Sequence, residues 1–498
     1  MLFDYDERDV NSILTYARQM EDLTYNDILS LCKDYLENAD SASTNRPKEF
    51  INSLKQDKFI KKTNAKGQLG NFIEKFYFGY EPNGNQEADL SKAGIEIKQT
   101  PIDITKNGEM RAGERLSITM ISYNEPVEED FYKSHVWEKI QRILLIHYIR
   151  DKNKPRLDYQ IKFVNLFTPP KEDLDIIIQD YKTINDKIKA GKAHELSESD
   201  TLYLGACTKG ATAKKSLRKQ YYNPDVPAKS RNFCFKNSYM NYVLQNYVLK
   251  KDPGESIIGD TSILNSISFE QYVLDRINSF AGKTDRDLCQ LFDRPYNNNK
   301  AQWVDLSYRM LGIKGNHAQE FQKANIVVKA IRIEQNGKIK ESMSFPPFKF
   351  KELVKEEWEE STLYEYFETT KFLFVVFKSN GEEYVLLGAQ MWNMPANDLN
   401  EIVREGWEKI RDKISEGIRF EIKPYGDSTR VENDLPKKAD NPIIHVRPHA
   451  QKAAFRLNNG YSVGNIRKDA NQLPDGQWMT TQSFWINNTY ILKQLHIL

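Results

Sequence analysis

The sequence has no closely spaced cysteine pairs. Its four cysteines, Cys32, Cys207, Cys234 and Cys289, are scattered along the chain, which argues against both a zinc ribbon and a disulfide framework. No apolar run reaches the length of about 18 residues that a membrane span needs. The N-terminus has neither the basic region nor the apolar region of a signal peptide. We therefore expect a cytoplasmic protein with no membrane partner.

The sequence also lacks an excess of charge of either sign. Its net charge is +1 over 498 residues, so any signal for nucleic-acid binding must be local. Hydrophobic residues make up 40% and charged residues 28% of the chain, as in ordinary globular proteins. The length predicts about two to four domains.

Four segments of the first half recur in the second half in the same order. The matched pairs are 13–31 with 273–291, 94–108 with 325–337, 180–191 with 406–417, and 232–244 with 483–495. The alternative is that unrelated domains carry similar amphipathic helices, and a fixed order of four matches argues against it. The halves therefore predict domains at 1–250 and 263–498, joined by a linker at 251–262 that contains proline, glycine and mixed charges.

Each half has the pattern of an α+β fold. Helical spacing of apolar residues covers 8–38, 70–79, 173–190 and 237–248, and strand-like alternation covers 94–104 and 115–123. The segment 134–150 begins as a helix and ends as a buried strand. Strands with helices packed on them predict a mixed α/β core.

An acidic motif lies in "EADLSKAGIEIKQTP", residues 87–101. Because successive strand side chains face opposite sides, Ile95 and Ile97 should point into the core, and Glu96 and Lys98 to the other face. Asp89 lies just upstream, and Glu74 lies on the preceding helix. Carboxylates so placed can share a magnesium ion, which prefers oxygen ligands. By itself the spacing also fits a solvated strand face with a Glu–Lys pair.

Three segments, "GNFIEKFYFG", "EADLSKAGIEIKQTPI" and "SHVWEKIQRIL", resemble in that order the MutH-like branch of the PD-(D/E)xK nucleases. Together with "CTKGA", "KESMSF", "HVRPH" and "TQSFWINN", the doubled chain is similar to the larger GATC-cutting type II restriction endonucleases of this branch. The resemblance implies a catalytic set of Glu74, Asp89, Glu96, Lys98 and Lys139, with Glu74, Asp89 and Glu96 as ligands of Mg²⁺, for which Mn²⁺ can substitute. One departure is that four residues, rather than three, separate Glu74 from Gly79.

The resemblance implies a Mg²⁺-dependent type II restriction endonuclease that cuts double-stranded DNA at 5′-GATC-3′. Two alternatives remain: a MutH-like strand-nicking repair endonuclease, and a catalytically inactive GATC-binding protein. The expected protein is a monomer in solution that can dimerise on DNA. A cognate methyltransferase would belong to the same system without forming a stable complex.

The second half has lost the acidic motif in the repeat alignment. Val327 stands opposite Glu96, and Lys329 stands opposite Lys98. Glu320 stands opposite Asp89, and Glu368 opposite Lys139. Because valine cannot bind a metal ion, we predict two tandem MutH-like domains that form a pseudo-dimer, with the second domain binding DNA and regulating the first.

A local basic cluster lies between residues 205 and 251, where ten lysines and arginines are opposed only by Asp225. Tyrosines and phenylalanines are interleaved, as is typical of phosphate-contacting surfaces. Lys209 matches the loop with which MutH-like enzymes read bases, and Arg447 and His449 lie in the corresponding segment of the second half. For Arg447, a base contact and a phosphate contact or surface ion pair remain equally open. The predicted DNA-binding residues are Lys209, Lys214, Lys215, Arg218, Arg231, Lys236, Arg447 and His449.

Overall fold

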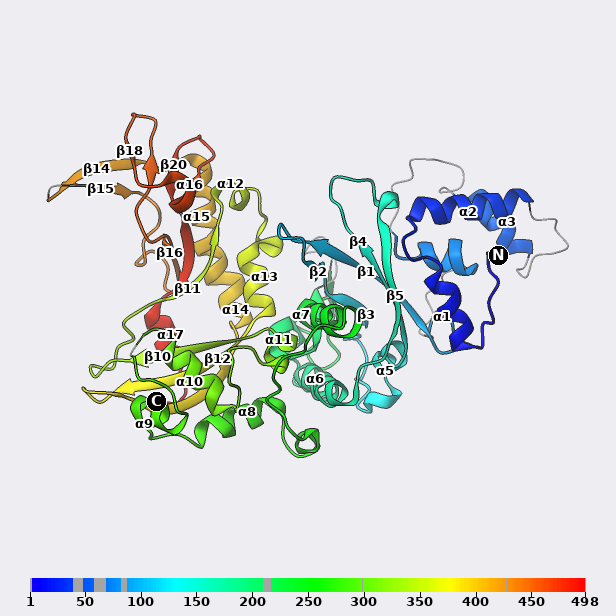
Figure 1. Ribbon diagram of the computed structural model, residues 1–498, viewed down its shortest axis with the longest axis horizontal. Helices are drawn as coiled ribbons and strands as arrows, with labels where there is room; N and C mark the ends of the chain where they lie inside the picture. Colours follow the sequence, from blue (N-terminus) through cyan, green and yellow to red (C-terminus); the bar gives the residue numbers. More distant parts are fainter. Residues whose placement is uncertain are drawn as a thin grey trace. The chain divides into compact units, whose positions relative to one another are not determined.

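The computed structural model describes residues 2–38, 48–57, 69–81, 87–208, 216–297, 299–426 and 428–497. The chain divides into two compact units. Unit 1 comprises residues 1–254, 258–266 and 319–325, and unit 2 comprises residues 255–257, 267–318 and 326–498. Helices and sheets are mixed in both units (Figure 1), which confirms the predicted mixed α/β class. The predicted domain bounds stay predictions.

Unit 1 begins with the helices α1 (Val10–Arg18), α2 (Tyr25–Asn38) and α3 (Lys48–Gln56). The Asp9 carboxylate accepts hydrogen bonds from backbone N–H groups in the first turn of α1 and so caps that helix. Helical spacing buries Ile13 and Tyr16, which belong to the same core cluster as Ile95 and Ile97. The prediction that Ile95 and Ile97 face the core is confirmed.

The first sheet of unit 1 has the strand order β2–β1–β4–β5. Its strands are β1 (Glu96–Ile104), β2 (Met110–Ala112), β4 (Ile143–Ile149) and β5 (Gln160–Phe167), and the helix α5 (His135–Ile140) precedes β4. β1 and β4 are parallel, whereas β2 and β5 are antiparallel to their neighbours. The predicted change from helix to buried strand within residues 134–150 is confirmed.

A second sheet of unit 1 has the antiparallel order β3–β9–β6. The remaining elements are β3 (Leu116–Met120), β6 (Leu204–Thr208), β7 (Leu217–Arg218), β8 (Ala228–Lys229), β9 (Arg231–Phe235), α6 (Lys171–Lys189) and α7 (Asn237–Tyr242). The Asp180 carboxylate of α6 accepts hydrogen bonds from the backbone N–H groups of Leu202, Tyr203 and Leu204, at 2.6–2.9 Å. These bonds anchor the start of β6 on α6.

A short helix from the second half of the sequence, α11 (Gln319–Ala324), belongs to unit 1. Its Lys323 ammonium lies 2.6 Å from the Asp173 carboxylate of α6, and both side chains are buried. The Tyr239 hydroxyl donates to the same carboxylate at 3.0 Å, and the Lys323 ammonium also lies 4.5 Å from the centre of the Tyr242 ring. The buried charges of Asp173 and Lys323 therefore compensate each other within unit 1.

Unit 2 contains two three-stranded sheets, with the orders β10–β12–β13 and β11–β21–β16. Their strands are β10 (Ile326–Ile333), β11 (Met343–Phe348), β12 (Lys371–Ser379), β13 (Tyr384–Trp392), β16 (Ile444–Pro448) and β21 (Gln482–Ile486). The other strands are β14 (Phe420–Tyr425), β15 (Ser428–Asn433), β17 (Phe455–Arg456), β18 (Ser462–Val463), β19 (Ala470–Gln472) and β20 (Trp478–Thr480). The helices are α8 (Phe269–Asn278), α9 (Asp285–Leu291), α10 (Gln302–Met310), α12 (Phe350–Leu353), α13 (Thr362–Thr369), α14 (Ala396–Asp398), α15 (Arg404–Glu416), α16 (Ile466–Asp469) and α17 (Asn488–Gln494).

The two units pair their strands in the same register. In unit 1, Glu96 of β1 lies opposite Ile143 of the parallel strand β4. In unit 2, Val327 of β10 lies opposite Phe372 of the parallel strand β12. These are the positions that the sequence repeats align, so the structure places Val327 where unit 1 has Glu96.

An irregularity in the sheets recurs as well. The antiparallel pairing of β4 with β5 shifts register between His147 and Tyr148 of β4. The antiparallel pairing of β12 with β13 shifts register between Val376 and Phe377 of β12. The second sheets, β3–β9–β6 and β11–β21–β16, also have matching orders. A bulge at the aligned position of each copy is a specific feature of a fold, and its recurrence shows that the two units share one plan of strand pairing.

The four cysteines are free and buried. In the part of the chain that the structure describes, every helix is too short or too polar to cross a bilayer.

Candidate active site

Glu74 lies on a π-helical turn, η1 (Glu74–Phe78), which ends at Gly79 in the left-handed conformation with φ 77°. The backbone N–H of Tyr80 donates to the Glu74 carbonyl at 3.3 Å. A π-helical turn holds one residue more than an α-helical turn. It therefore accommodates the extra residue between Glu74 and Gly79 while keeping Glu74 buried beside Asp89.

Asp89 and Glu96 face each other across a tight turn that leads into β1. The turn is closed by a bridge between Leu90 and Ile95. The Asp89 carboxylate accepts the backbone N–H of Ile97 at 2.9 Å, and the Asp89 N–H donates to Glu96 Oε2 at 3.3 Å. These bonds hold the two acids together without any contribution from a ligand.

Glu96 is clamped between two lysines. Its Oε1 lies 2.8 Å from Lys98 Nζ, and its Oε2 lies 2.8 Å from Lys139 Nζ. Lys139 lies on α5, where the Ser134 hydroxyl caps the helix, and its ammonium also donates to the Glu87 carbonyl at 2.5 Å. The Glu96 side chain is only 3% exposed. This burial rules out the solvated strand face that the spacing alone allowed.

Burial and neighbouring carboxylates raise the pKa values of Glu74 and Asp89. Burial, with a further contribution from Asp89, raises the pKa of Glu74 to about 8. Burial and the neighbouring Glu96 raise the pKa of Asp89 to about 6, against the opposing effect of Lys98 and Lys139. Three carboxylates thus share two ammonium groups, and the cluster is short of positive charge when all three are ionised.

This donor set fits a divalent cation of the hard, oxygen-binding kind. Carboxylate oxygens are the ligands that such ions prefer, and an ion would supply the missing positive charge. Within the described ranges, no three histidine, cysteine, aspartate or glutamate side chains already form a complete ligand group, and both Glu96 oxygens are held by lysines. Glu74, Asp89 and Glu96 are therefore candidate ligands whose side chains must adjust to bind an ion.

One residue at the site escaped the sequence analysis. The Tyr80 hydroxyl is buried and has no hydrogen-bond partner among the described residues. Burial and the nearby Asp89 and Glu74 raise the pKa of Tyr80 far above its ordinary value. The hydroxyl is therefore a neutral hydrogen-bond donor beside the two acids. In the sequence, the signal that pointed to this residue was the extra residue before Gly79.

The aligned positions of the second half hold no comparable cluster. Val327 and Lys329 lie on β10, whereas Glu320 lies on α11 in unit 1 and accepts the backbone N–H of Ile258 at 3.4 Å. Glu368 is buried near the end of α13. Of the four catalytic positions that have an aligned residue in the second half, unit 2 thus retains only the lysine equivalent to Lys98.

The predicted DNA-binding residues of unit 1 divide into three groups. Lys209, Lys214 and Lys215 lie outside the described residues. Arg218 is exposed on β7. For Arg231 and Lys236 the structure contradicts the prediction, because their exposed fractions are only 5% and 1%. Arg231 donates a hydrogen bond to the Ala206 carbonyl at 2.6 Å, and Lys236 donates one to the Thr201 carbonyl at 2.6 Å. These two cations are used inside the fold and are not available to contact phosphates.

Arg447 and His449 lie at the exposed end of β16, and both are near the ring of Trp485. The Arg447 guanidinium lies 4.6 Å from the centre of the Trp485 ring, and the His449 ring lies 6.3 Å from it. Arg447 lies on the strand itself, whereas His449 is the first residue after it. Both side chains are exposed, and their role in DNA binding stays a prediction.

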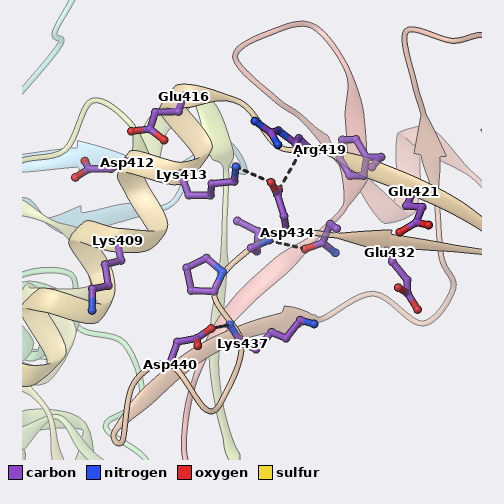
Figure 2. Close-up of a pocket in the computed structure, with 14 residues that line it drawn as sticks. Lys409, Asp412, Lys413, Glu416, Arg419, Glu421, Glu432, Asp434, Lys437 and Asp440 are labelled. Carbon is purple, nitrogen blue, oxygen red and sulfur yellow. Dashed lines mark hydrogen bonds and ion pairs between the residues drawn. The ribbon is translucent and has the colours of Figure 1, made fainter.

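Unit 2 also has an open hollow of about 1040 Å³ beside α15 and the hairpin β14–β15. Figure 2 shows that charged side chains of both signs surround it, and that the Lys413 ammonium meets the Asp434 carboxylate, at 2.6 Å. Its lining includes six acids and four bases. This balance does not suit a polyanion, so we do not place DNA there.

Comparisons with known proteins agree with the geometry. The family model described as "DNA mismatch repair enzyme MutH" matches residues 78–180, a stretch that contains four of the five predicted catalytic residues. The Type II restriction enzyme Sau3AI of Staphylococcus aureus is 36% identical over 462 residues, which cover 86% of this chain and 92% of that protein. The DNA mismatch repair protein MutH of Vibrio parahaemolyticus is 25% identical over 217 residues, which cover 43% of this chain and 88% of that protein.

Proposed function

The chain belongs to the MutH-like type II restriction endonucleases, and from this premise we propose that it cuts double-stranded DNA at 5′-GATC-3′ in a Mg²⁺-dependent reaction. It is a site-specific nuclease that hydrolyses DNA. The observation that carries the proposed site is the buried Glu96 carboxylate, held between Lys98 and Lys139 and hydrogen-bonded to the Asp89 backbone. The GATC sequence rests on the family resemblance.

In the proposed reaction, Lys98 is the residue that meets the scissile phosphate. Its side chain is partly exposed, whereas Lys139 is buried. An ammonium group at that point stabilises the negative charge that develops on the phosphate and orients the attacking water. Lys139 holds Glu96 in place from behind, because it is also bound to the Glu87 carbonyl.

Restriction endonucleases generally use a divalent metal ion, and here we assign it to Glu74, Asp89 and Glu96. When bound, Mg²⁺ supplies Lewis acidity that stabilises charge on the phosphate and lowers the pKa of water. Mn²⁺ is expected to substitute because it also accepts oxygen ligands. The protein contributes the prearranged acids, whose mutual repulsion a cation relieves.

We also propose that the two halves form a pseudo-dimer of tandem MutH-like domains, with bounds at 1–250 and 263–498. The common strand register and the matching bulges support this arrangement. The MutH relative from Vibrio supports it too, since 88% of that protein corresponds to 43% of this chain. The second domain would bind another GATC duplex through Arg447 and His449 and favour the active state of the first.

Within this proposal, Lys209, Lys214, Lys215 and Arg218 supply DNA contacts in the first domain. The protein would act in the cytoplasm, as a monomer in solution that can dimerise on DNA. The corresponding methyltransferase would protect the same sequence without forming a stable complex with this chain.

The test is to incubate the purified protein with a plasmid and Mg²⁺ and to map the ends of the products. We expect linear fragments whose ends all lie at GATC, and no cutting when EDTA removes the metal ion. Nicked circles alone would favour the strand-nicking repair endonuclease. DNA that is bound but never cut would favour the inactive binding protein.

A further inference from the structure

A cavity of about 360 Å³ in unit 2 lies beside β10, the strand that corresponds to β1 of the candidate active site. β10 is the edge strand of its sheet, so one side of it is open to side chains from α10, β11 and β21. Lys329 and Arg332 of β10 line the cavity together with Trp303 and Trp485. The cavity therefore includes Lys329, the residue aligned with Lys98 of the candidate active site.

Among the described residues, neither cation of β10 forms an ion pair with a carboxylate, although Arg332 lies close enough to Glu341 to help lower its pKa. Lys98 is paired with Glu96 in unit 1, but Val327 takes the place of that acid, and Lys329 forms no hydrogen bond or ion pair with any described residue. Burial lowers the pKa of Lys329. The Arg332 guanidinium lies 4.3 Å from the centre of the Trp303 ring, and among the described side chains it has no hydrogen-bond acceptor.

The neutral donors of the cavity are unused as well. The indole nitrogens of Trp303 and Trp485 are both buried, and neither has a hydrogen-bond partner among the described residues. A buried N–H without an acceptor costs free energy. Two such groups line the same cavity as two cations that form no ion pair among the described residues, and this set of donors fits an acceptor with negative charge.

The acids on the cavity wall are already occupied. Glu341 lies 2.9 Å from the Lys300 ammonium, and Glu334 accepts a hydrogen bond from the Tyr384 hydroxyl at 3.0 Å. Neither acid is bonded to Lys329. The groups that remain free are therefore donors, in contrast to the acid-rich hollow of Figure 2.

We propose that this cavity binds a backbone phosphate of DNA without a metal ion, at the open edge of β10. Lys329 and Arg332 would reach the phosphate around this edge from opposite faces of the strand, together with the indole N–H groups of Trp303 and Trp485. The choice of DNA rests on the proposed function, and a second observation supports it. Trp485 is the residue against which Arg447 packs, at 4.6 Å. A phosphate held in the cavity would thus lie beside the side chain assigned to base reading, as phosphate contacts commonly set the register for base contacts.

The test uses the full chain in EDTA, so that no DNA is cut, and a short GATC duplex titrated by fluorescence anisotropy and calorimetry. Lys329→Met and Arg332→Met should each weaken the binding of one of two duplexes about tenfold. Each should also lower the slope of log K against log [salt] by about 0.9, the value for one lost phosphate contact. Lys378→Met is the matched control, because Lys378 is exposed on β12 of the same sheet and outside the cavity. It should leave both quantities unchanged.

Thermal unfolding without DNA separates an anion site from a structural role. Removing an unpaired buried charge should leave the unfolding temperature of Lys329→Met unchanged or raise it. A structural lysine would give the opposite result, a lower unfolding temperature with unaltered DNA binding, and that outcome would overturn the proposal. Trp485→Phe, which keeps an aromatic ring but removes the indole N–H, should weaken the binding of the second duplex about fivefold.

Two further outcomes would also overturn the proposal. One is saturation of the wild-type chain at a single duplex. The other is tight binding of inorganic phosphate that duplex DNA does not displace, which would assign the cavity to a free anion. Plasmid cutting by the wild-type chain tests the proposed function independently. If the wild-type chain cuts at GATC while Lys329→Met binds DNA as tightly as the wild type, the proposed function stands and only this inference is wrong.

Discussion

The raised pKa of Glu74 predicts that the metal-free protein becomes less stable as the pH rises. A carboxyl group whose pKa is higher in the folded state holds its proton more tightly there. Its contribution is fully present below the ordinary pKa of 4.5 and is lost as the pH approaches about 8. Glu74→Gln keeps a neutral side chain at every pH and should remove this loss.

The size of the effect follows from the same two pKa values. A rise from 4.5 to about 8 sets an upper bound of ~5 kcal/mol on the stability lost between those pH values. Relaxation around the ionised group reduces this amount, and we expect ~2 kcal/mol between pH 5 and pH 8. The pKa of Asp89 is raised to about 6, so Asp89 adds a second loss of stability, which takes place at lower pH than the loss from Glu74.

The assay is chemical unfolding in EDTA at pH 5, 6.5 and 8, with wild type and Glu74→Gln compared at each pH. Taking the difference between the two proteins cancels the titration of the groups that do not interact with Glu74. Glu87→Gln is the control, because it removes an exposed acid from the segment that leads to Asp89. Saturating Mg²⁺ should stabilise the wild type more at pH 8 than at pH 5, since protons must leave before the ion binds. A difference between wild type and Glu74→Gln that stays constant with pH would refute the reasoning.

Four other predictions concern single side chains. Glu96→Gln should reduce cutting by at least about 10³-fold and leave DNA binding intact, because the acid is lost but the basic surface is not; near wild-type cutting would contradict the assigned site. Lys209→Ala should relax discrimination at one base pair and reduce the binding free energy by about 1–3 kcal/mol. The measurement is binding to GATC and to its single-base variants, and equal weakening on all of these sequences would show that Lys209 contacts only phosphate. Arg447→Ala should abolish the acceleration of one-site plasmid cutting by a GATC oligonucleotide added in trans; unaltered acceleration, or saturation at one duplex per chain, would favour a clamp around a single site. Lys323→Met should destabilise the protein by about 3–5 kcal/mol because it leaves Asp173 buried and unpaired, and unfolding of the double variant with Asp173→Asn should recover most of this loss.

The strand pattern was sufficient to place the acidic motif correctly. Alternation in "GIEIKQT" predicted that Ile95 and Ile97 are buried, and the structure confirms this. The proximity of Asp89 and Glu96 could be predicted because both lie within one short turn. The resemblance, and not spacing, brought in Lys139, which is 43 residues from Glu96 and meets it only through the pairing of β1 with β4.

Other features depend on tertiary contacts that a linear pattern does not contain. Counting charges placed Arg231 and Lys236 on a DNA-binding surface, although strand β9 is central in its sheet and both cations bond to carbonyls inside the fold. Nothing in the sequence around Lys323 indicated that its partner is Asp173, 150 residues away. The unused hydroxyl of Tyr80 follows from the π-helical turn, which is visible only once the hydrogen bonds are known.

The position of α11 has a consequence for dividing the chain into fragments. Residues 319–325 belong to unit 1, although residues 267–318 before them and 326–498 after them belong to unit 2. A break near residue 254 leaves Asp173 on the first fragment without Lys323, and a break after residue 325 takes residues 267–318 away from unit 2. No single break in the backbone therefore yields two complete halves. If the chain arose by duplication, this interleaving makes the fusion hard to reverse.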